Sequence, residues 1–368
     1  MFLLIWRNLK MSKRLLWLNG IAIIAVAVHH AAAFSLQAMF DWTDRYMAVE
    51  VPNYDQIGSP AYYILMLIRL LLTFAGPAFF FISGYFIGIA AKGSQSTISW
   101  SLVFSRIKLL IVPFFLWTVV RYILLRDLPR SIDDILTPYH WIPLLIQFYL
   151  LAPFIVILVK RNWKLFLLSI ALIGMSGSLM SWLAAFDWAP AHELESSLPN
   201  WFFLTNMPFW FPFGVVVSLN LAQFKPLLNH YRWHLLIASI VMAILVLVEY
   251  VIVDNVTGAA WLGPGFSGFT KLPYSLSLIL CFLAFEKSRM PLAEEVSQIG
   301  TKSLGIYLGN IPSVYVAAVL MYRLTPWILG YQLLYLAILI LVGLGIPLLL
   351  MYVVRISPVR YRYRTLFG

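Results

Sequence analysis

Long apolar runs separated by short polar segments repeat along the whole chain. A helix needs about 20 apolar residues to cross a hydrocarbon core of ~30 Å. Ten runs reach or approach this length, and they cover residues 15–34, 64–91, 102–124, 140–159, 165–188, 201–221, 234–253, 272–285, 304–322 and 327–354. Strands of a membrane β-barrel would alternate apolar and polar side chains, and these runs do not. The pattern predicts an all-α, polytopic helical bundle in a membrane, with about ten transmembrane helices, or nine if the shortest run, 272–285, does not span.

Cationic side chains gather on one side of these runs. With the N-terminus inside, the inner segments hold 19 of the 26 Lys and Arg residues but only three of the 15 acids, Glu286, Glu294 and Glu295. Because cytoplasmic segments are enriched in Lys and Arg, both termini should be cytoplasmic and the protein should lie in the cell inner (plasma) membrane. The inner cations are Arg7, Lys10, Lys13, Arg14, Lys92, Arg106, Lys108, Lys160, Arg161, Lys164, Lys225, Arg232, Lys287, Arg289, Lys302, Arg355, Arg360, Arg362 and Arg364.

The composition excludes a soluble protein. Of 368 residues, 62% are hydrophobic and 11% are charged, whereas a soluble domain has about 25% charged residues. The net charge of +11 fits inner helix ends that face anionic lipid head groups, so we expect the bilayer and no nucleic acid as a partner. A single cysteine, Cys281, excludes a disulfide framework and a multi-cysteine zinc site. The pattern predicts one membrane domain over residues 1–368, without a metal ion.

The first run contains the clearest polar group within a span. Asn19, His29 and His30 lie in it, and a histidine can act as a general base near neutral pH. Equally, one histidine could hydrogen-bond to a neighbouring carbonyl group while the other meets interfacial water. Adjacent residues point about 100° apart on a helix, so only one histidine can face a given pocket.

Four more charged residues lie in or at the ends of the runs. Arg69 could reach the outer interface or meet an anionic group within the bundle. Glu249 could belong to a proton relay, pair with an arginine, or simply reach the outer face. Arg106 and Lys108 open the third run from the inside, where they could bind the phosphates of a cytoplasmic donor or act as ordinary topology anchors.

The second run is interrupted by Gly76, Pro77 and Gly84. Such residues can break a helix, and the backbone groups they free are tolerated only where protein or cavity water satisfies them. The alternative for Gly84 is close packing of two helices.

Five segments resemble the membrane-bound acyltransferase-3 family, the O-acyltransferases of bacterial surface glycans, which include relatives associated with intercellular adhesion. The segments are LNGIAIIAVAVHH, PAFFFISGYFIG, SRIKLLIVPFFLW, HWIPLLIQFYLLAPFI and KSLGIYLGNIP. In the family, an arginine in the first helix precedes a histidine by ten intervening residues; here Asn19 and His30 take those positions. The basic pair of the third helix is similar to Arg106 and Lys108, and Asn310 stands where the late element usually ends in histidine.

The resemblance implies a transferase that moves an acyl group, acetyl in particular, from cytoplasmic acyl-CoA to a hydroxyl of a surface polysaccharide or lipid-linked glycan. It implies acyl-CoA as a substrate, no tightly bound cofactor, and a glycan synthase as a possible partner. His30 is the expected catalytic base. The expected donor- and substrate-binding residues are Arg106, Lys108, Asn19, Arg69, Ser83, Tyr307 and Asn310, and the secondary candidates are His29, Glu249, Trp141 and Tyr149.

Two other functions stay open. Some relatives associated with an exported adhesive polysaccharide have been interpreted as non-catalytic exporters or assembly factors, and Asn at positions 19 and 310 favours that alternative. A small-molecule transporter is the third hypothesis, because a broken second helix alone would allow it.

Overall fold

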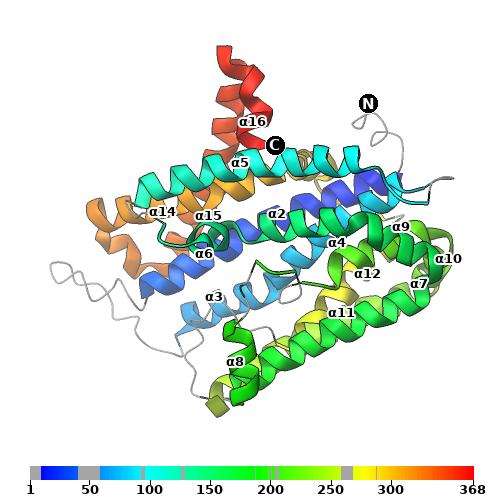
Figure 1. The fold of residues 1–368 in the computed structure, drawn as a ribbon. Helices are drawn as coiled ribbons and strands as arrows, with labels where there is room; N and C mark the ends of the chain where they lie inside the picture. Colours follow the sequence, from blue (N-terminus) through cyan, green and yellow to red (C-terminus); the bar gives the residue numbers. More distant parts are fainter. Residues whose placement is uncertain are drawn as a thin grey trace.

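The structure, a computed structural model, describes residues 10–39, 59–92, 96–125, 129–186, 188–197, 199, 201–203, 207–257, 268–286 and 288–368. Two of the predicted inner cations, Arg7 and Lys287, lie outside these residues. Within the described chain all regular structure is helical (Figure 1). The longer helices are α2 (Lys10–Gln37), α3 (Pro60–Leu71), α4 (Ala75–Ala90), α5 (Trp100–Leu125), α7 (Trp141–Ala185), α9 (Trp210–Leu219), α10 (Leu221–His230), α11 (Arg232–Thr257), α12 (Lys271–Ala284), α14 (Ser303–Leu324) and α15 (Gln332–Ile356). Shorter elements are η3 (Leu72–Phe74), α6 (Ile132–Leu136), η4 (Thr137–Tyr139), α8 (Ala189–Ser197), α13 (Ala293–Gly300), η5 (Pro326–Gly330), η6 (Pro358–Arg362) and α16 (Tyr363–Phe367).

The helix lengths confirm a polytopic membrane protein. Seven helices among the described residues are long and apolar enough to cross a membrane, or eight if the bent pair α9–α10 is one span. The number differs from ten partly because α7, at 45 residues, contains two predicted runs, 140–159 and 165–188. Between them Asn162 has non-helical angles, φ −158° and ψ 88°, and its side chain accepts a hydrogen bond from the Leu165 N–H. The run at 272–285 forms α12, which at 14 residues is short for a span.

The predicted span at residues 201–221 does not form one continuous helix among the described residues. The helix α9 begins only at Trp210, because Met207 has a φ of 59° and is followed by Pro208, which has no N–H to donate. At its other end the chain turns by 97° into α10. This region is therefore a short buried helix followed by a sharp bend.

The second run is broken one turn earlier than its Gly and Pro positions indicated. Pro77 cannot donate a hydrogen bond to the carbonyl group of Thr73, and the chain forms the 3₁₀ turn η3 immediately before α4. Gly84 serves close helix packing, because a Cβ atom there would lie 1.9 Å from the Phe211 carbonyl oxygen of α9. From the other side, a Cβ atom on Gly214 would lie 2.1 Å from the Phe81 carbonyl oxygen. Thus α4 and α9 pack backbone against backbone.

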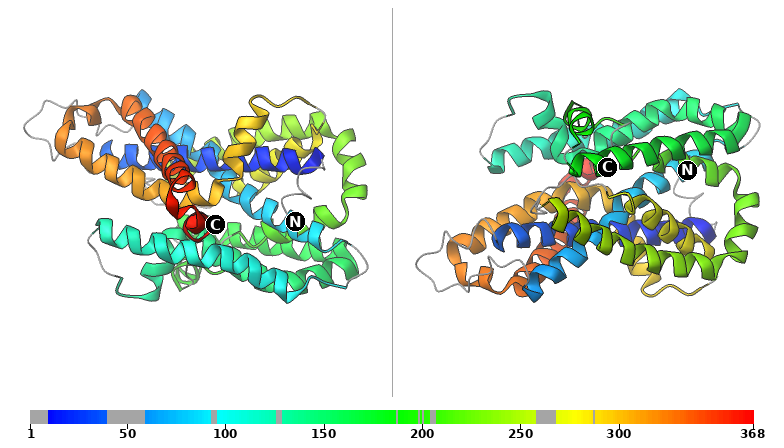
Figure 2. Two further views of the ribbon diagram at one scale, coloured as in Figure 1. Left: turned by 90° about the horizontal axis from the view of Figure 1, so that it is seen from above. Right: turned by 90° about the horizontal axis from the view of Figure 1, so that it is seen from below.

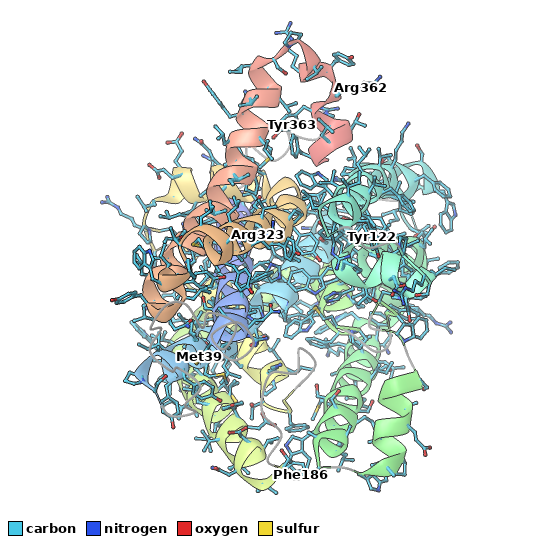
Figure 3. All side chains as sticks on the ribbon, turned by 90° about the vertical axis from the view of Figure 1, so that its left-hand side faces the viewer. Met39, Tyr122, Phe186, Arg323, Arg362 and Tyr363 are labelled. Atoms are coloured by element: carbon cyan, nitrogen blue, oxygen red, sulfur yellow. The ribbon has the colours of Figure 1, made fainter. Side chains whose placement is uncertain are left out.

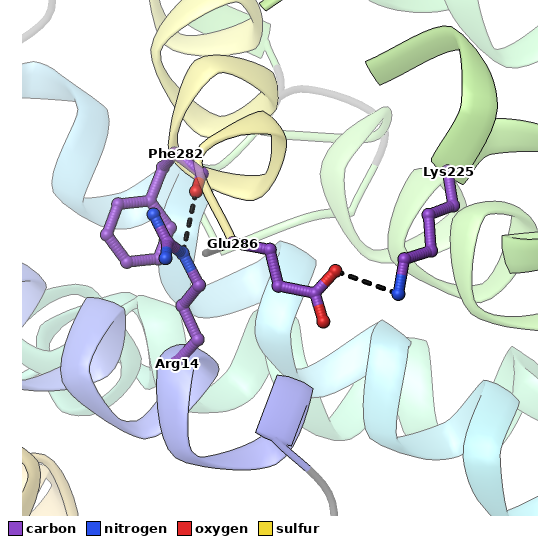
Figure 4. A network of polar contacts seen from close by, with 4 residues as sticks. All are labelled: Arg14, Lys225, Phe282 and Glu286. Atoms are coloured by element: carbon purple, nitrogen blue, oxygen red, sulfur yellow. Dashed lines mark hydrogen bonds and ion pairs between the residues drawn. The ribbon is translucent and has the colours of Figure 1, made fainter. Parts of the chain in front are cut away.

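Helix α2 lies in the middle of the bundle and contacts α3, α4, α13, α14 and α15 (Figures 1 and 2). Near its start the buried Arg14 donates from Nε to the Phe282 carbonyl oxygen at 2.8 Å and lies 4.7 Å from the centre of the Phe282 ring (Figure 4). Beside it Lys225 of α10 forms a salt bridge of 3.0 Å with Glu286, which follows α12 (Figure 4). The Arg14 contacts fix the start of α2 against α12, and the salt bridge fixes α10 against the end of α12.

The last helices form an arm at one side of the molecule. Figure 3 shows Arg362 and Tyr363 in this arm, after the end of α15. Helix α16 then returns toward α5, where the Trp117 indole donates from Nε1 to the Leu366 carbonyl oxygen at 2.9 Å and Phe367 is buried. Helix α16 thus packs against α5 and α14, and Gly368, which follows it, lines the cavity described next.

Candidate active site

A cavity of about 290 Å³ lies between α2, α4, α5, α7 and α14. Six of the residues predicted from the sequence line it, and they come from all five helices: Asn19, Ser83, Arg106, Trp141, Tyr149 and Tyr307. The rest of its wall is mainly apolar. Since Asn19, Arg106 and the adjoining Ser303 lie near the helix ends that the charge pattern assigns to the cytoplasm, we call this the inner cavity.

Only one member of the predicted basic pair faces the inner cavity. Arg106 lines it and lies within electrostatic range of Tyr149, which in turn lies against Ser83. Lys108 is exposed on α5 and is not part of the cavity wall. Residues two positions apart point about 200° from each other on a helix, which is why the two cations separate.

Asn19 fixes the wall of the inner cavity. Its Nδ2 donates to the Gly300 carbonyl oxygen at 2.7 Å and to Ser303 Oγ at 2.9 Å. These bonds connect α2 to the junction between α13 and α14. The Asn19 amide thus positions these helices, at a place where the family that the sequence resembles has an arginine.

His30 is held by Asn310. The distance from His30 Nδ1 to Asn310 Oδ1 is 2.7 Å, and Asn310 Nδ2 donates to the Gly343 carbonyl oxygen at 3.0 Å. That carbonyl is available because Pro347, four residues later in α15, has no N–H to donate to it. Gly343 also lets the amide approach, since a Cβ atom there would lie 2.5 Å from Asn310 Nδ2.

This network determines the tautomer of the imidazole. A carbonyl oxygen can only accept, so the NH₂ group of Asn310 must face Gly343 and its oxygen must face His30. The neutral His30 ring therefore carries its proton on Nδ1 and donates it to Asn310. Its Nε2 is left with a free lone pair, as a general base requires.

His29 points toward a different part of the bundle. Both histidines lie within electrostatic range of the buried Arg69 on α3, but His29 also lies within range of Lys271 on α12, whereas His30 contacts Asn310 on α14. Glu249 caps α12: its carboxylate accepts from the Phe269 N–H at 2.7 Å and the Thr270 N–H at 3.0 Å. None of these three predicted residues, His29, Arg69 and Glu249, lines the inner cavity.

Two neighbours of the site, Tyr139 and His140, were not singled out from the sequence. The Tyr139 hydroxyl donates at 3.0 Å to the Leu308 carbonyl oxygen, which lacks a helical donor because Pro312 lies four residues later. His140 lies within electrostatic range of His30. The prolines inside α14 and α15 could have indicated such contacts from the sequence, because each proline leaves one backbone carbonyl without a helical donor, and a side chain must then donate to it.

Aromatic rings pack between the inner cavity and the His30–Asn310 pair. Trp141 and Tyr307 are stacked with their ring centres 5.4 Å apart and their planes 5° from parallel. Tyr139 contacts Tyr307 edge-on at 5.9 Å. Tyr307 precedes Asn310 by about one helical turn, so this stack forms the part of the inner cavity wall that lies nearest to the pair along α14.

The segment before Tyr139 is held by a capped turn. The Ser131 side chain accepts from the Asp134 N–H, and the Asp134 carboxylate accepts from the backbone N–H groups of Arg130 and Ser131. These donors hold the pKa of Asp134 below its ordinary value. Trp201 donates from Nε1 to the Asp133 carboxylate at 2.6 Å, which further fixes the segment that leads into α7.

Comparison with known proteins found one match. The acyltransferase-3 family model, described as an acyltransferase domain, matches residues 14–352. No curated protein matches the chain, and no solved structure matches it. The matched residues include α2 and α14, which carry His30 and Asn310, and α5, which carries Arg106.

Proposed function

Because the chain belongs to the acyltransferase-3 family and is a membrane acyltransferase, we propose that it transfers an acyl group, acetyl in particular, from cytoplasmic acyl-CoA to a glycan hydroxyl. The acceptor is a surface polysaccharide or its lipid-linked precursor, and the protein acts in the inner (plasma) membrane, with a glycan synthase as a partner that supplies the acceptor. The observation that carries the proposal is the His30–Asn310 pair, which leaves His30 Nε2 as a free acceptor of a proton.

The donor occupies the inner cavity. Arg106 at its wall is suited to the phosphates of CoA, because a guanidinium forms charge-assisted bonds with phosphate oxygens. The apolar remainder of the wall suits the long arm that carries the thioester. Lys108, outside the wall, acts as a topology anchor.

His30 activates the acceptor. Its Nε2 takes the proton of the glycan hydroxyl while the hydroxyl oxygen attacks the thioester carbonyl carbon. The new C–O bond forms, the C–S bond breaks, and the sulfur of CoA leaves and receives the proton. Asn310 fixes the ring throughout and stabilises the imidazolium by accepting its Nδ1–H.

The asparagine at position 310 is compatible with catalysis. It provides one acceptor to His30 and one donor to Gly343, and a histidine at this position would provide the same two functions with its two ring nitrogens. The exporter hypothesis is favoured by Asn19, which has no positive charge. Against it, Asn19 is engaged in two hydrogen bonds that shape the wall of the inner cavity.

The two histidines provide the test. A strain lacking the gene is complemented with wild-type protein, His30→Ala or His29→Ala, and ester groups on released surface glycan are measured by mass spectrometry. We expect His30→Ala to abolish esters at a normal protein level, because a general base contributes about 10²–10⁴-fold in rate. His29→Ala should retain substantial activity, since Asn310 holds the ring of His30 and not that of His29. Esters that persist in His30→Ala contradict the assignment of the base, and absence of esters in the wild type favours the exporter.

A further inference from the structure

A second cavity, of about 240 Å³, lies beyond the His30–Asn310 pair. It is formed by the last turns of α2 and α5 and by the middle of α14. Its lining residues are Phe34, Gln37, Arg121, Leu124, Ile311, Pro312 and Tyr315. By the charge pattern of the sequence these helix ends face away from the cytoplasm, so we call it the outer cavity.

The two cavities lie on opposite sides of the pair along the same two helices. On α2 the inner cavity includes Asn19, whereas the outer cavity includes Phe34 and Gln37, four and seven residues beyond His30. At 1.5 Å per residue these are about 6 and 10 Å from His30 along the helix. On α14 the inner cavity ends at Tyr307 and the outer cavity begins at Ile311, directly after Asn310. The cavities share no lining residue.

Arg121 is the charged group of the outer cavity. It forms no salt bridge with any carboxylate among the described residues, and its guanidinium lies 5.3 Å from the centre of the Tyr122 ring. It is within electrostatic range of Tyr139, whose hydroxyl donates to the carbonyl oxygen of Leu308, two residues before Asn310 in α14. The remaining polar groups of the wall are the Gln37 amide and the Tyr315 hydroxyl, so a cation and neutral hydrogen-bonding groups face an otherwise apolar space.

We propose that the outer cavity binds the acceptor through an anionic group, a carboxylate or a phosphate, which pairs with Arg121. The bound anion positions the glycan so that a hydroxyl farther along the molecule reaches His30 Nε2. The inference rests on the proposed function for the identity of the acceptor as a glycan. It adds that the acceptor is negatively charged, either through an acidic sugar or through the diphosphate of a lipid carrier.

Binding is measured by isothermal titration on the full chain in nanodiscs of neutral lipid. The probes are a hyaluronan hexasaccharide, which carries carboxylates; N-acetylglucosamine linked to a polyprenyl diphosphate; and chitohexaose, a neutral hexasaccharide. We expect wild type to bind at least one anionic probe and to bind chitohexaose at least ten times more weakly. Arg121→Gln should weaken binding of that anionic probe about ten- to a hundred-fold, whereas Arg121→Lys should recover part of it.

Arg323→Gln is the matched control, because Arg323 is an exposed arginine at the outer end of α14 that does not line the cavity. Its affinities should equal those of wild type. Binding of the hexasaccharide identifies an acidic sugar as the source of the anion, and binding of the diphosphate alone identifies the lipid carrier; both support the proposal.

The proposal is overturned if neither anionic probe binds, if Arg121→Gln stays within two-fold of wild type, or if Arg323→Gln loses as much affinity. Because none of these measurements needs acyl transfer, they separate failure of the anion site from failure of the proposed activity. Thermal unfolding in detergent verifies that each variant is folded.

Discussion

Asn310 is the residue whose replacement tests the proposed geometry most directly. It is fully buried, and it joins His30 on α2 to Gly343 on α15. In Asn310→Leu the Gly343 carbonyl and the His30 Nδ1–H both lose their partner, at a cost of roughly 1–3 kcal/mol for each buried group left unpaired. The imidazole is then free to rotate and to carry its proton on either nitrogen.

The expected loss of activity follows from one of these two bonds. The hydrogen bond to His30 orients the base, and a loss of about 1–3 kcal/mol corresponds to a rate about 5- to 150-fold lower. Asn310→His should stay within about ten-fold of wild type, because one ring nitrogen can accept from His30 while the other donates to Gly343. This rescue separates a positioning role from a simple packing role.

The assay compares glycan ester content, normalised to protein level, among wild type, both Asn310 variants and Ser313→Ala. The control residue is buried on the same helix, but its hydroxyl donates to the Gly309 carbonyl oxygen at 2.7 Å and does not touch His30. The reasoning is refuted if Asn310→Leu keeps more than half of wild-type activity. It is equally refuted if Asn310→His is folded and as inactive as Asn310→Leu.

Two further predictions concern the inner cavity and the bundle. Arg106→Gln should raise the KM for acetyl-CoA about ten-fold or more, since charge-assisted bonds contribute roughly 1.5–3 kcal/mol. The KM of Lys108→Gln should remain near that of wild type. Equal effects of the two substitutions in membrane assays would argue against the donor site. Gly84→Val should destabilise the protein by more than about 1 kcal/mol, because its Cβ would lie 1.9 Å from the Phe211 carbonyl oxygen. The melting temperature of Gly84→Val in detergent should fall. Gly177→Ala should melt like wild type, because a Cβ atom at Gly177 would have no neighbour within 4 Å. An unchanged melting temperature of Gly84→Val would contradict the close packing of α4 and α9.

Apolar runs predicted most of the helices, because length and hydropathy alone decide whether a segment can cross lipid. They could not predict the chain between residues 201 and 221. There the start of α9 depends on the positive φ of Met207, and its end depends on a bend of 97° into α10. A hydropathy pattern predicts neither the positive φ nor the bend.

The candidate site was partly accessible from the sequence. The resemblance indicated both His30 and Asn310, but their contact joins residues 280 positions apart and needed the structure. The role of Glu249 was missed for a similar reason: it caps a helix that begins about 20 residues later in the sequence. The separation of Arg106 from Lys108 could have been derived, because a spacing of two residues places side chains on nearly opposite faces of a helix.

The location of His30 and Asn310 between two separate cavities has an electrical consequence. In the proposed reaction the hydroxyl proton enters the pair from the outer cavity and ends on the sulfur of CoA in the inner cavity. On the outer side a neutral hydroxyl becomes a neutral ester, and on the inner side the thioester of CoA becomes its thiol without a change of charge, so a turnover moves no net charge across the membrane. One elementary charge that crosses the membrane gains about 2.3 kcal/mol per 100 mV of potential. Because this contribution is absent from the proposed reaction, the membrane voltage should leave the equilibrium of ester formation unchanged, and the thioester alone supplies the driving energy.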